Sequence, residues 1–194
     1  MASYSTVSAA SDRSETNHTM YDDLVKTFDC SVDKDILHYL QVSSWDSTGK
    51  KEAMTTLVVD EMGRLQGFYA LAISLLELDI MALDKKKDRE RVQRIATLKD
   101  GTIYLLPCIL LAQLGKNYSK DIPKEERITG KKLLSYAWED MRSAQSLIGG
   151  VACYLECKDV EILKKFYSDE GFTEIGTTIA KKKQETLIQY IKML

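Results

Sequence analysis

The chain has 194 residues, of which 44% are hydrophobic and 29% are charged, a composition typical of a soluble globular domain. The formal net charge of -2 gives no global signal for binding nucleic acid or an anionic membrane. Four cysteines without C-x-x-C spacing and only two histidines argue against a structural metal, because a zinc site needs about four such ligands. No apolar run approaches the roughly 20 residues that span a bilayer.

The N-terminal residues 1–18 are predicted to form a disordered tail ahead of a single domain at 19–194. This tail is rich in Ser, Thr and Ala. It has neither a basic start nor a continuous apolar stretch, so we expect neither a signal peptide nor a membrane anchor.

The first half of the domain is predicted to contain a strand, a helix and a β-hairpin. Apolar residues at helical spacing indicate the helix, and Ser31 or Asp33 is available to cap its start. Within the second hairpin strand, Gly67 indicates a bulge or a close backbone approach. The expected elements are a short strand at 21–28, a helix at 32–41, a polar loop at 43–50, and strands at 53–60 and 65–78.

A basic segment follows the hairpin. Residues 85–94 carry six Lys or Arg side chains against two acidic ones, although the whole chain is slightly acidic. Two interpretations stay open for this segment. It is the solvated face of a helix, or it contacts an anionic substrate or partner.

The second half alternates strands and helices. The periodicity predicts a strand at 102–114, a polar loop at 116–126, a helix at 131–148, an apolar central strand at 151–157, a helix up to Gly171, and a hairpin at 172–180 and 186–193. This order predicts an α/β (α+β) domain with a mixed sheet.

Two cysteines in the central strand indicate the redox compartment. Cys153 and Cys157 are four residues apart, which is roughly 13 Å along a strand. That distance is too long for a disulfide. We therefore predict reduced thiols and a cytoplasmic location.

Residues 107–172 read as one ligand-binding unit. A strand, a loop ending in Arg127-Ile-Thr-Gly130 and the start of a helix together are typical of an anion cradle. One strand later, Tyr167 adds a candidate proton donor. The order favours a phosphate-bearing cofactor and an acid-assisted reaction.

From Phe28 to Ile191 the chain resembles the GNAT superfamily of acyl-CoA N-acyltransferases. The strongest match is Phe166-Tyr167, three residues, then Gly171-Phe172, which is similar to the family's FYxxxGF segment. Weaker matches are Leu111-Ala112-Gln113, similar to the end of the family's fourth strand, and Gly130-Lys-Lys-Leu-Leu134, similar to the end of its pyrophosphate loop. Phe28-Asp-Cys30 ahead of a helix resembles the opening of a subgroup of toxin-type acetyltransferases acting on aminoacyl-tRNA.

The loop departs from the family pattern Gln/Arg-x-x-Gly-x-Gly/Ala. With Gly130 as its last small residue, Glu125 and Ile128 stand at positions that the family fills differently. Starting the motif at Arg127 instead puts Lys132 at the last glycine. Either register keeps one glycine, and Val160 replaces an asparagine that the family often has.

The resemblance implies a GNAT-like, mostly antiparallel central sheet flanked by helices and splayed between its fourth and fifth strands. It also implies an N-acetyltransferase that moves an acetyl group from acetyl-CoA, its cosubstrate, to a primary amine by direct attack in a ternary complex. Tyr167 is then the catalytic acid that protonates the leaving thiolate. The residues assigned to the cofactor are Leu111, Ala112, Gln113, Arg127, Ile128, Thr129, Gly130 and Lys131.

The sequence leaves three acceptor classes open, namely a small molecule, a protein and aminoacyl-tRNA. Glu156, near the end of a central strand, could orient or deprotonate an amine, although a carboxylate there is more often only solvated. The alternatives are a toxin-like enzyme acting on aminoacyl-tRNA and a non-catalytic GNAT-like binding or regulatory module. We expect no membrane contact, and the resemblance leaves room for a homodimer or a protein partner.

Overall fold

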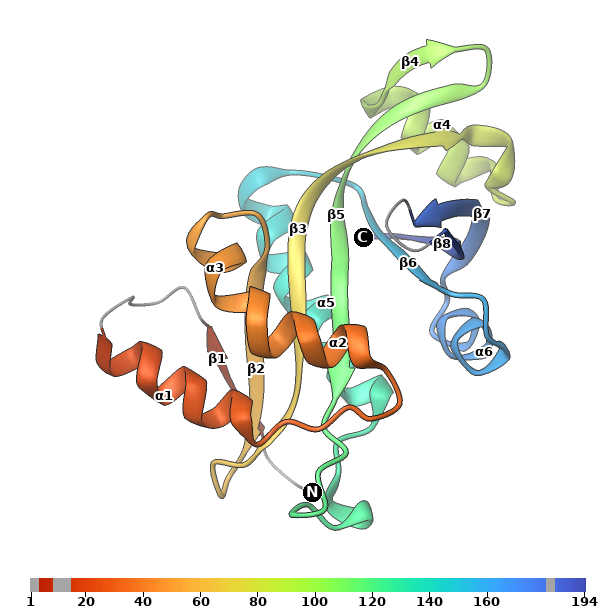
Figure 1. Cartoon of the computed structure of the whole chain (residues 1–194). Coiled ribbons are helices and arrows are strands. Elements are labelled where there is room, and N and C mark those ends of the chain that lie inside the picture. Colours follow the sequence, from red (N-terminus) through yellow and green to blue (C-terminus); the bar gives the residue numbers. More distant parts are fainter. Residues whose placement is uncertain (1–3, 9–14, 181–183) are drawn as a thin grey trace. The chain divides into compact units, whose positions relative to one another are not determined.

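The computed structural model describes residues 4–8, 15–180 and 184–194 (Figure 1). Its elements largely follow the predicted alternation of strands and helices. In chain order they are β1 (Tyr4–Ser8), α1 (Glu15–Lys26), α2 (Lys34–His38), η1 (Tyr39–Ser43), α3 (Ser44–Gly49), β2 (Met54–Asp60), β3 (Leu65–Asp79), η2 (Ile80–Ala82), α4 (Lys86–Ile95), β4 (Thr97–Asp100), β5 (Ile103–Lys116), η3 (Lys124–Glu126), α5 (Gly130–Ile148), β6 (Ala152–Lys158), α6 (Glu161–Asp169), β7 (Thr173–Ala180) and β8 (Glu185–Met193).

The strands form a mixed, mostly antiparallel sheet flanked by helices, which confirms the predicted fold class. Hydrogen-bonded neighbours follow the order β1-β2-β3-β5-β6-β8-β7, and β4 pairs with β5 outside this path. The β1–β2, β2–β3, β4–β5, β6–β8 and β7–β8 pairs are antiparallel, whereas β5 and β6 run parallel. In the part of the chain that the structure describes, no helix is both long and apolar enough to cross a membrane.

The parallel ladder between β5 and β6, the predicted fourth and fifth strands, is short. Its residue pairs are Ile109 with Cys153 and Leu110 with Tyr154. Both strands continue beyond these pairs, β5 to Lys116 and β6 to Lys158. A ladder limited in this way agrees with the predicted open sheet.

The chain divides into two compact units that interleave in sequence. One consists of the chain up to Ala72 with Leu111–Glu139, and the other of Ile73–Leu110 with Asp140–Leu194. In the first, α1, α2 and η1 pack against β2 and β3 through a core that includes Tyr21, Leu40, Leu57 and Phe68. The core of the second includes Leu78, Val92, Leu106, Tyr154 and Ile191.

The prediction of a strand at 21–28 was wrong, because this segment lies largely in helix α1. Tyr21 and Val25 are buried, and Leu24 packs against the same core. With Phe28 they recur at helical spacing, so one face of α1 is apolar. The β-preferring side chains of Tyr, Val and Phe gave the misleading local signal.

The predicted loop at 43–50 was also wrong, since most of it forms α3. Its hydroxyl groups are buried and bonded inside the protein. Ser44 Oγ lies 2.7 Å from the Tyr21 hydroxyl and donates to the carbonyl of Leu40. Thr48 Oγ1 accepts the N–H of Thr55. Tyr21 and Thr55 lie outside this segment, so the polar composition of the segment alone suggested a loop. By contrast, the helix predicted ahead of it is confirmed, and Asp33 caps it through the N–H of Asp35.

Part of the expected N-terminal tail is ordered. Tyr4–Ser8 forms β1 and pairs antiparallel with β2, from Tyr4 opposite Asp60 to Ser8 opposite Thr56. Helix α1 begins at Glu15, also inside the range expected to be a tail. The other positions of that expectation, 1–3 and 9–14, lie outside the described residues.

The structure shows both features predicted for Gly67, a β-bulge and a close backbone approach. The β2–β3 register shifts beside it, because Val58 pairs with Gly67 while Val59 pairs with Leu65. A Cβ atom on Gly67 would lie 2.7 Å from the carbonyl oxygen of Gly115 and 3.0 Å from a methyl carbon of Leu133. The glycine therefore lets β5 and helix α5 approach β3 closely.

Replacing Gly67 with alanine is expected to lower the free energy of unfolding by about 2 kcal/mol, because the contact with backbone oxygen cannot relax by side-chain rotation. Urea unfolding measures this loss. Gly63→Ala is the control: it lies in a turn with nothing within 4 Å of the added methyl, so it loses only through its positive φ. Equal losses in the two variants would contradict the close-packing account.

Candidate functional site

The candidate phosphate loop ends in a capped helix. Thr129 Oγ1 accepts the N–H of Lys132 at 3.1 Å, and the Thr129 carbonyl accepts the N–H of Leu133. Helix α5 therefore begins at Gly130. The first N–H groups of an α-helix have no partner within the helix, and its dipole favours an anion there. The start of α5, at Gly130 and Lys131, consequently has the local chemistry of a phosphate site.

Arg127 holds the preceding loop closed. Its guanidinium donates to the carbonyl of Ile122 at 3.0 Å through Nε and to the carbonyl of Ser119 at 2.8 Å through Nη2. This side chain therefore has a structural role in the loop. Its positive charge also acts beyond the loop, because burial and the nearby Arg127 together lower the pKa of Lys116, at the end of β5. Two cations close together favour a bound anion.

Replacing Lys116 with methionine is expected to have opposite effects on the unliganded protein and on cofactor binding. Folding lowers the pKa of Lys116, so its protonation opposes folding at neutral pH, and its removal should stabilise the protein slightly. We expect a gain below about 1 kcal/mol, because solvent screens this partly exposed group. Lys116 Nζ lies 5.6 Å from the centroid of the Tyr118 ring. If this cation also contacts the phosphates of acetyl-CoA, its loss should weaken binding about fivefold.

Thermal unfolding and calorimetric titration with acetyl-CoA measure the two effects. Lys120→Met, an exposed lysine of the same loop, is the matched control and should change neither quantity. A fall in stability together with unchanged affinity would contradict an anion site at Lys116.

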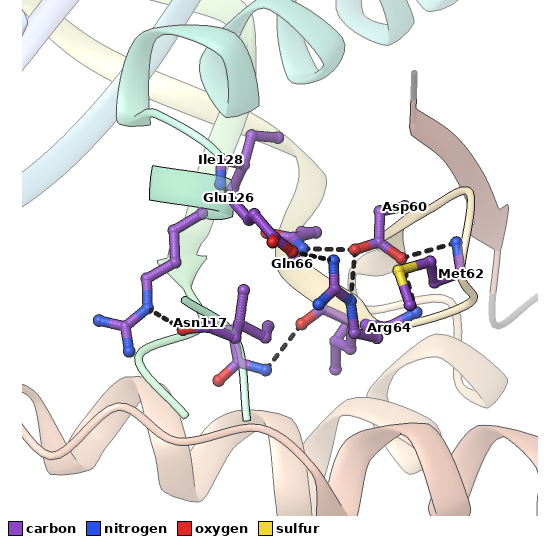
Figure 2. Close-up of polar contacts among 10 residues, drawn as sticks. Asp60, Met62, Arg64, Gln66, Asn117, Glu126 and Ile128 are labelled. Carbon is purple, nitrogen blue, oxygen red and sulfur yellow. Dashed lines mark hydrogen bonds and ion pairs between the residues drawn. The ribbon is translucent and has the colours of Figure 1, made fainter. Parts of the chain in front are cut away.

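A polar network links the loop to strands β2 and β3 and anchors it there (Figure 2). Gln66, 1% exposed, stands at the register shift between β2 and β3. Its amide nitrogen donates to Asp60 Oδ2 at 2.7 Å, and its amide oxygen accepts the N–H of Ile128 at 3.1 Å. Ile128 is itself 1% exposed. The N–H of Ile128 thus faces Gln66 and is not available to a phosphate.

The carboxylate of Asp60 accepts several hydrogen bonds in this network. Besides Gln66, it accepts the N–H groups of Met62 and Arg64 and the Nε of Arg64 at 2.8 Å. Desolvation by itself would raise the pKa of Asp60, but these hydrogen bonds and the Arg64 charge lower it below its usual value. Arg64 also donates to Glu126 at 2.6 Å, just ahead of the loop (Figure 2).

Asn117 fixes the chain that leaves β5. It is 1% exposed, and its amide nitrogen donates to the carbonyls of Leu65 and Thr27. Its amide oxygen accepts the N–H of Asp29 at 2.9 Å. The Phe28-Asp-Cys30 segment is therefore tied to the end of β5. Sequence reasoning missed Asp60, Gln66 and Asn117, although a glutamine between two apolar strand residues was a usable signal.

The predicted pantetheine segment lies in β5. Leu111 is buried, whereas Ala112 and Gln113 are half-buried. Gly115, two residues later, packs against Phe68, whose ring carbon would lie 2.6 Å from an added Cβ. β5 thus packs closely against β3 just after this segment.

Tyr167 is positioned by the way helix α6 ends. The N–H of Phe172 donates to the carbonyl of Tyr167, and the N–H of Gly171 donates to the carbonyl of Ser168, at 3.0 Å in both cases. With Gly171 at φ 80°, this is a Schellman motif. The apolar contact that accompanies such a motif is the Tyr167–Phe172 ring pair, with centroids 5.6 Å apart. The Phe-Tyr…Gly-Phe spacing therefore has a structural cause.

The surroundings of Tyr167 keep its phenol protonated. It is 7% exposed and contacts the rings of Phe166, Phe172 and Tyr190. Burial first, and then the nearby thiols of Cys157 and Cys153, raise the pKa of Tyr167 well above its usual value. A tyrosine is neutral at physiological pH, so its hydroxyl carries a proton that a leaving thiolate could take, although the raised pKa makes this phenol a weaker acid than an exposed tyrosine.

The cysteines lack the character of nucleophiles. All four are buried and free of disulfide bonds in the structure. Burial raises the pKa of Cys108 and of Cys157 to about 11 in each case, so both stay protonated near neutral pH. Among the described residues, no group of three or more His, Cys, Asp or Glu could hold a metal ion.

The basic segment forms helix α4, as expected, with one apolar residue, Val92, buried. Arg91 donates to the carbonyl of Leu194 at 2.8 Å, and Lys86 lies 3.7 Å from Glu90. Lys85, Lys87 and Arg94 are exposed. The structure thus bears out a solvated helical face, and the cations stay accessible to an anionic partner.

Taken together, the element order and sheet topology define the GNAT fold, which confirms the resemblance seen in the sequence. No protein-family model and no curated protein matches this chain. Similar solved structures include AtaT complexed with acetyl-methionyl-tRNAfMet, which is 17% identical with a TM-score of 0.63 over 96% of this chain and 94% of that one.

Two further neighbours are tyrosine-to-phenylalanine mutants. The AtaT toxin bound to the C-terminus of the antitoxin AtaR and acetyl-CoA is 14% identical, with a TM-score of 0.58 over 100% of this chain and 93% of that one. A KacT mutant is 16% identical, with a TM-score of 0.63 over 96% and 94%. At these identities the similarity establishes the fold.

Proposed function

We propose that the protein is an acetyl-CoA-dependent N-acetyltransferase that transfers the acetyl group to a primary amine by direct attack. The observation that carries this proposal is Tyr167, a neutral, buried phenol held in a Schellman motif within a GNAT fold. The acetyl-CoA bound in the AtaT–AtaR complex supports the choice of acyl donor. The reduced, buried cysteines support a cytoplasmic location.

Each proposed role follows from local chemistry. The start of α5, from Thr129 to Lys131, would bind the pyrophosphate, with Arg127 and Lys116 adding positive charge. Backbone groups of Leu111–Gln113 would bind the pantetheine arm. One N–H of that strand would stabilise the tetrahedral oxyanion, a contribution of about 3 kcal/mol. Tyr167 would protonate the departing sulfur, whose thiol pKa is about 8.5.

Thermal unfolding with and without acetyl-CoA tests this proposal. Ligand that binds only the folded state at a hundred times its Kd adds about 2.7 kcal/mol of stability. We expect a clear rise in Tm with acetyl-CoA and none with acetate. Absence of a rise at millimolar acetyl-CoA would instead favour the alternative of a non-catalytic GNAT-like binding or regulatory module.

Aminoacyl-tRNA is the acceptor class that we propose among primary amines. The AtaT complex with acetyl-methionyl-tRNAfMet supports it, and so does the excess of cations on α4, because phosphate contacts dominate the affinity for nucleic acids. Incubation of charged tRNA with labelled acetyl-CoA, followed by mass spectrometry of the released amino acid, tests the class. Acetylation of small amines or proteins alone would exclude it.

A further inference from the structure

Two residues of β8 contact the turn that carries Tyr167. The ring centroids of Tyr167 and Tyr190 lie 5.8 Å apart. Lys192 Nζ donates to the carbonyl of Glu170 at 2.7 Å and lies 5.5 Å from the centroid of the Phe172 ring. Residues two apart on a strand point to the same face, so both side chains meet the turn from one side. We call Tyr190 and Lys192 the β8 pair.

The β8 pair differs from other contacts of Tyr167, because it belongs to the sheet. Phe166 and Phe172 also contact the Tyr167 ring, but they lie in the same turn and would move with it. Tyr190 instead stands opposite Leu155 of β6 in the antiparallel β6–β8 ladder. The β8 pair therefore connects the turn that carries Tyr167 to the strands of the sheet.

The Tyr190 side chain is itself fixed at its hydroxyl end. It is 1% exposed, and its hydroxyl donates to Glu174 Oε2 at 3.3 Å. Glu174 is its cross-strand partner on β7. Burial first, and then the charge of Glu174, raise the pKa of Tyr190, and a hydrogen bond with Ser168 opposes this rise. Ser168 follows Tyr167 in α6, so the Tyr190 hydroxyl joins β7 to the helix that carries Tyr167.

Lys192 acts at the C-terminal end of the same helix. Glu170 is the C-cap of α6, and its carbonyl accepts the lysine Nζ. The last carbonyls of a helix have no partner within it, and the helix dipole favours a cation there. A Cβ atom on Gly171 would lie 3.8 Å from Lys192 Cε, so the lysine chain passes the turn at van der Waals distance. Lys192 thus holds the end of the helix while Tyr190 supports the Tyr167 ring.

We propose that Tyr190 and Lys192 are positioning residues for acetyl transfer, which hold the Tyr167 hydroxyl where the leaving sulfur can take its proton. This inference rests on the proposed acetyltransferase function. A general acid acts within hydrogen-bond reach, about 3 Å, of the atom that it protonates. A displacement of about 1 Å can cost about 100-fold in rate. Both residues act through Tyr167 and exchange no proton with the substrates.

Tyr190→Phe tests this role, because it removes the hydroxyl and keeps the ring. With total charged tRNA and labelled acetyl-CoA, we expect kcat to fall about 10-fold while the Kd for acetyl-CoA stays within about twofold. Lys192→Met keeps a long side chain but loses the bond to Glu170, and it should lower kcat about fivefold.

Tyr21→Phe is the matched control, because it also removes a buried hydroxyl, which lies 2.7 Å from Ser44 Oγ. Both tyrosine variants lose a buried hydrogen bond, so each should lower the Tm by about 3 °C. Only Tyr190→Phe should lower kcat.

A double-mutant cycle separates positioning of Tyr167 from a general loss of structure. The acid is absent in Tyr167→Phe, so adding Tyr190→Phe to that variant should lower kcat by less than about twofold. The same holds for Lys192→Met. The effects are therefore expected to be strongly non-additive.

A loss of kcat that is as large in the Tyr167→Phe background as in the wild type would overturn the inference and leave the acetyltransferase intact. An equal loss of kcat in Tyr21→Phe, or full turnover in Tyr190→Phe, would overturn it as well. If the wild type modifies another amine and no charged tRNA, the same cycle is measured with that amine. If it acetylates nothing, the proposed function fails, and the inference fails with it.

Discussion

Tyr167→Phe is expected to lower kcat about 100-fold while leaving the Kd for acetyl-CoA within about twofold. The variant keeps the ring that packs on Phe172 and the backbone bonds of the Schellman motif, so the fold should persist. It loses only the hydroxyl that protonates the leaving sulfur. Rapid-mixing kinetics with labelled acetyl-CoA measures kcat, and calorimetric titration measures the Kd.

Tyr104→Phe is the control for this change, because Tyr104 belongs to β5 in the same unit and has no proposed role. Its kcat should match that of the wild type. Equal turnover in the Tyr167 variant would remove this phenol from the mechanism. A loss of acetyl-CoA affinity of the same size as the loss in kcat would give Tyr167 a binding role instead.

Gln66→Leu is expected to produce the largest loss of stability. It removes the amide nitrogen and the amide oxygen of a side chain that is 1% exposed, so Asp60 loses one donor and the N–H of Ile128 loses its acceptor. We expect a loss of about 3 kcal/mol in the free energy of unfolding and a weaker affinity for acetyl-CoA, because the loop loses its anchor. Gln41→Leu, which loses one long, part-buried bond to the carbonyl of Phe28, should cost under about 1 kcal/mol.

Gln66→Glu tests whether the hydrogen bond to Asp60, and not packing alone, stabilises the fold at this position. The new carboxyl keeps the shape of glutamine but stands against Asp60, so its folded pKa should rise above the usual value of about 4.3. Repulsion then destabilises the variant at neutral pH and is relieved as pH falls through that raised pKa. The wild type behaves in the opposite way, since the lowered pKa of Asp60 gives stability that is lost only in acid. A stability gap that does not narrow between about pH 7 and pH 5 would contradict this account.

Much of the fold could be predicted because its patterns are local. The hairpin of β2 and β3, helix α5 and strand β6 have apolar residues at the expected spacing. Helix α3 could not be predicted in this way, because Tyr21 and Thr55, the partners of its hydroxyl groups, lie elsewhere in the sequence. Strand β1 was missed for the same reason, since its stability comes from pairing with β2.

The same distinction between local patterns and distant contacts applies to the candidate site. The Tyr167 turn is local, and its sequence spacing identified it. The anchor of the phosphate loop is not local, because Gln66 and Ile128 are 62 residues apart. Sequence reasoning placed Ile128 among the cofactor ligands, which stays a prediction, but it did not reveal that the N–H of Ile128 is bonded to Gln66. A pattern within one loop cannot reveal a partner on a distant strand.

The most direct test of the central claim is acetyl transfer itself. Wild-type protein, labelled acetyl-CoA and total charged tRNA are incubated together, and label is measured both on amino nitrogen and as free acetate. We expect label to accumulate on the amine in step with the release of CoA thiol, and to fall about 100-fold with Tyr167→Phe. Release of thiol without any labelled amine, or labelling that is unchanged in Tyr167→Phe, would contradict the account.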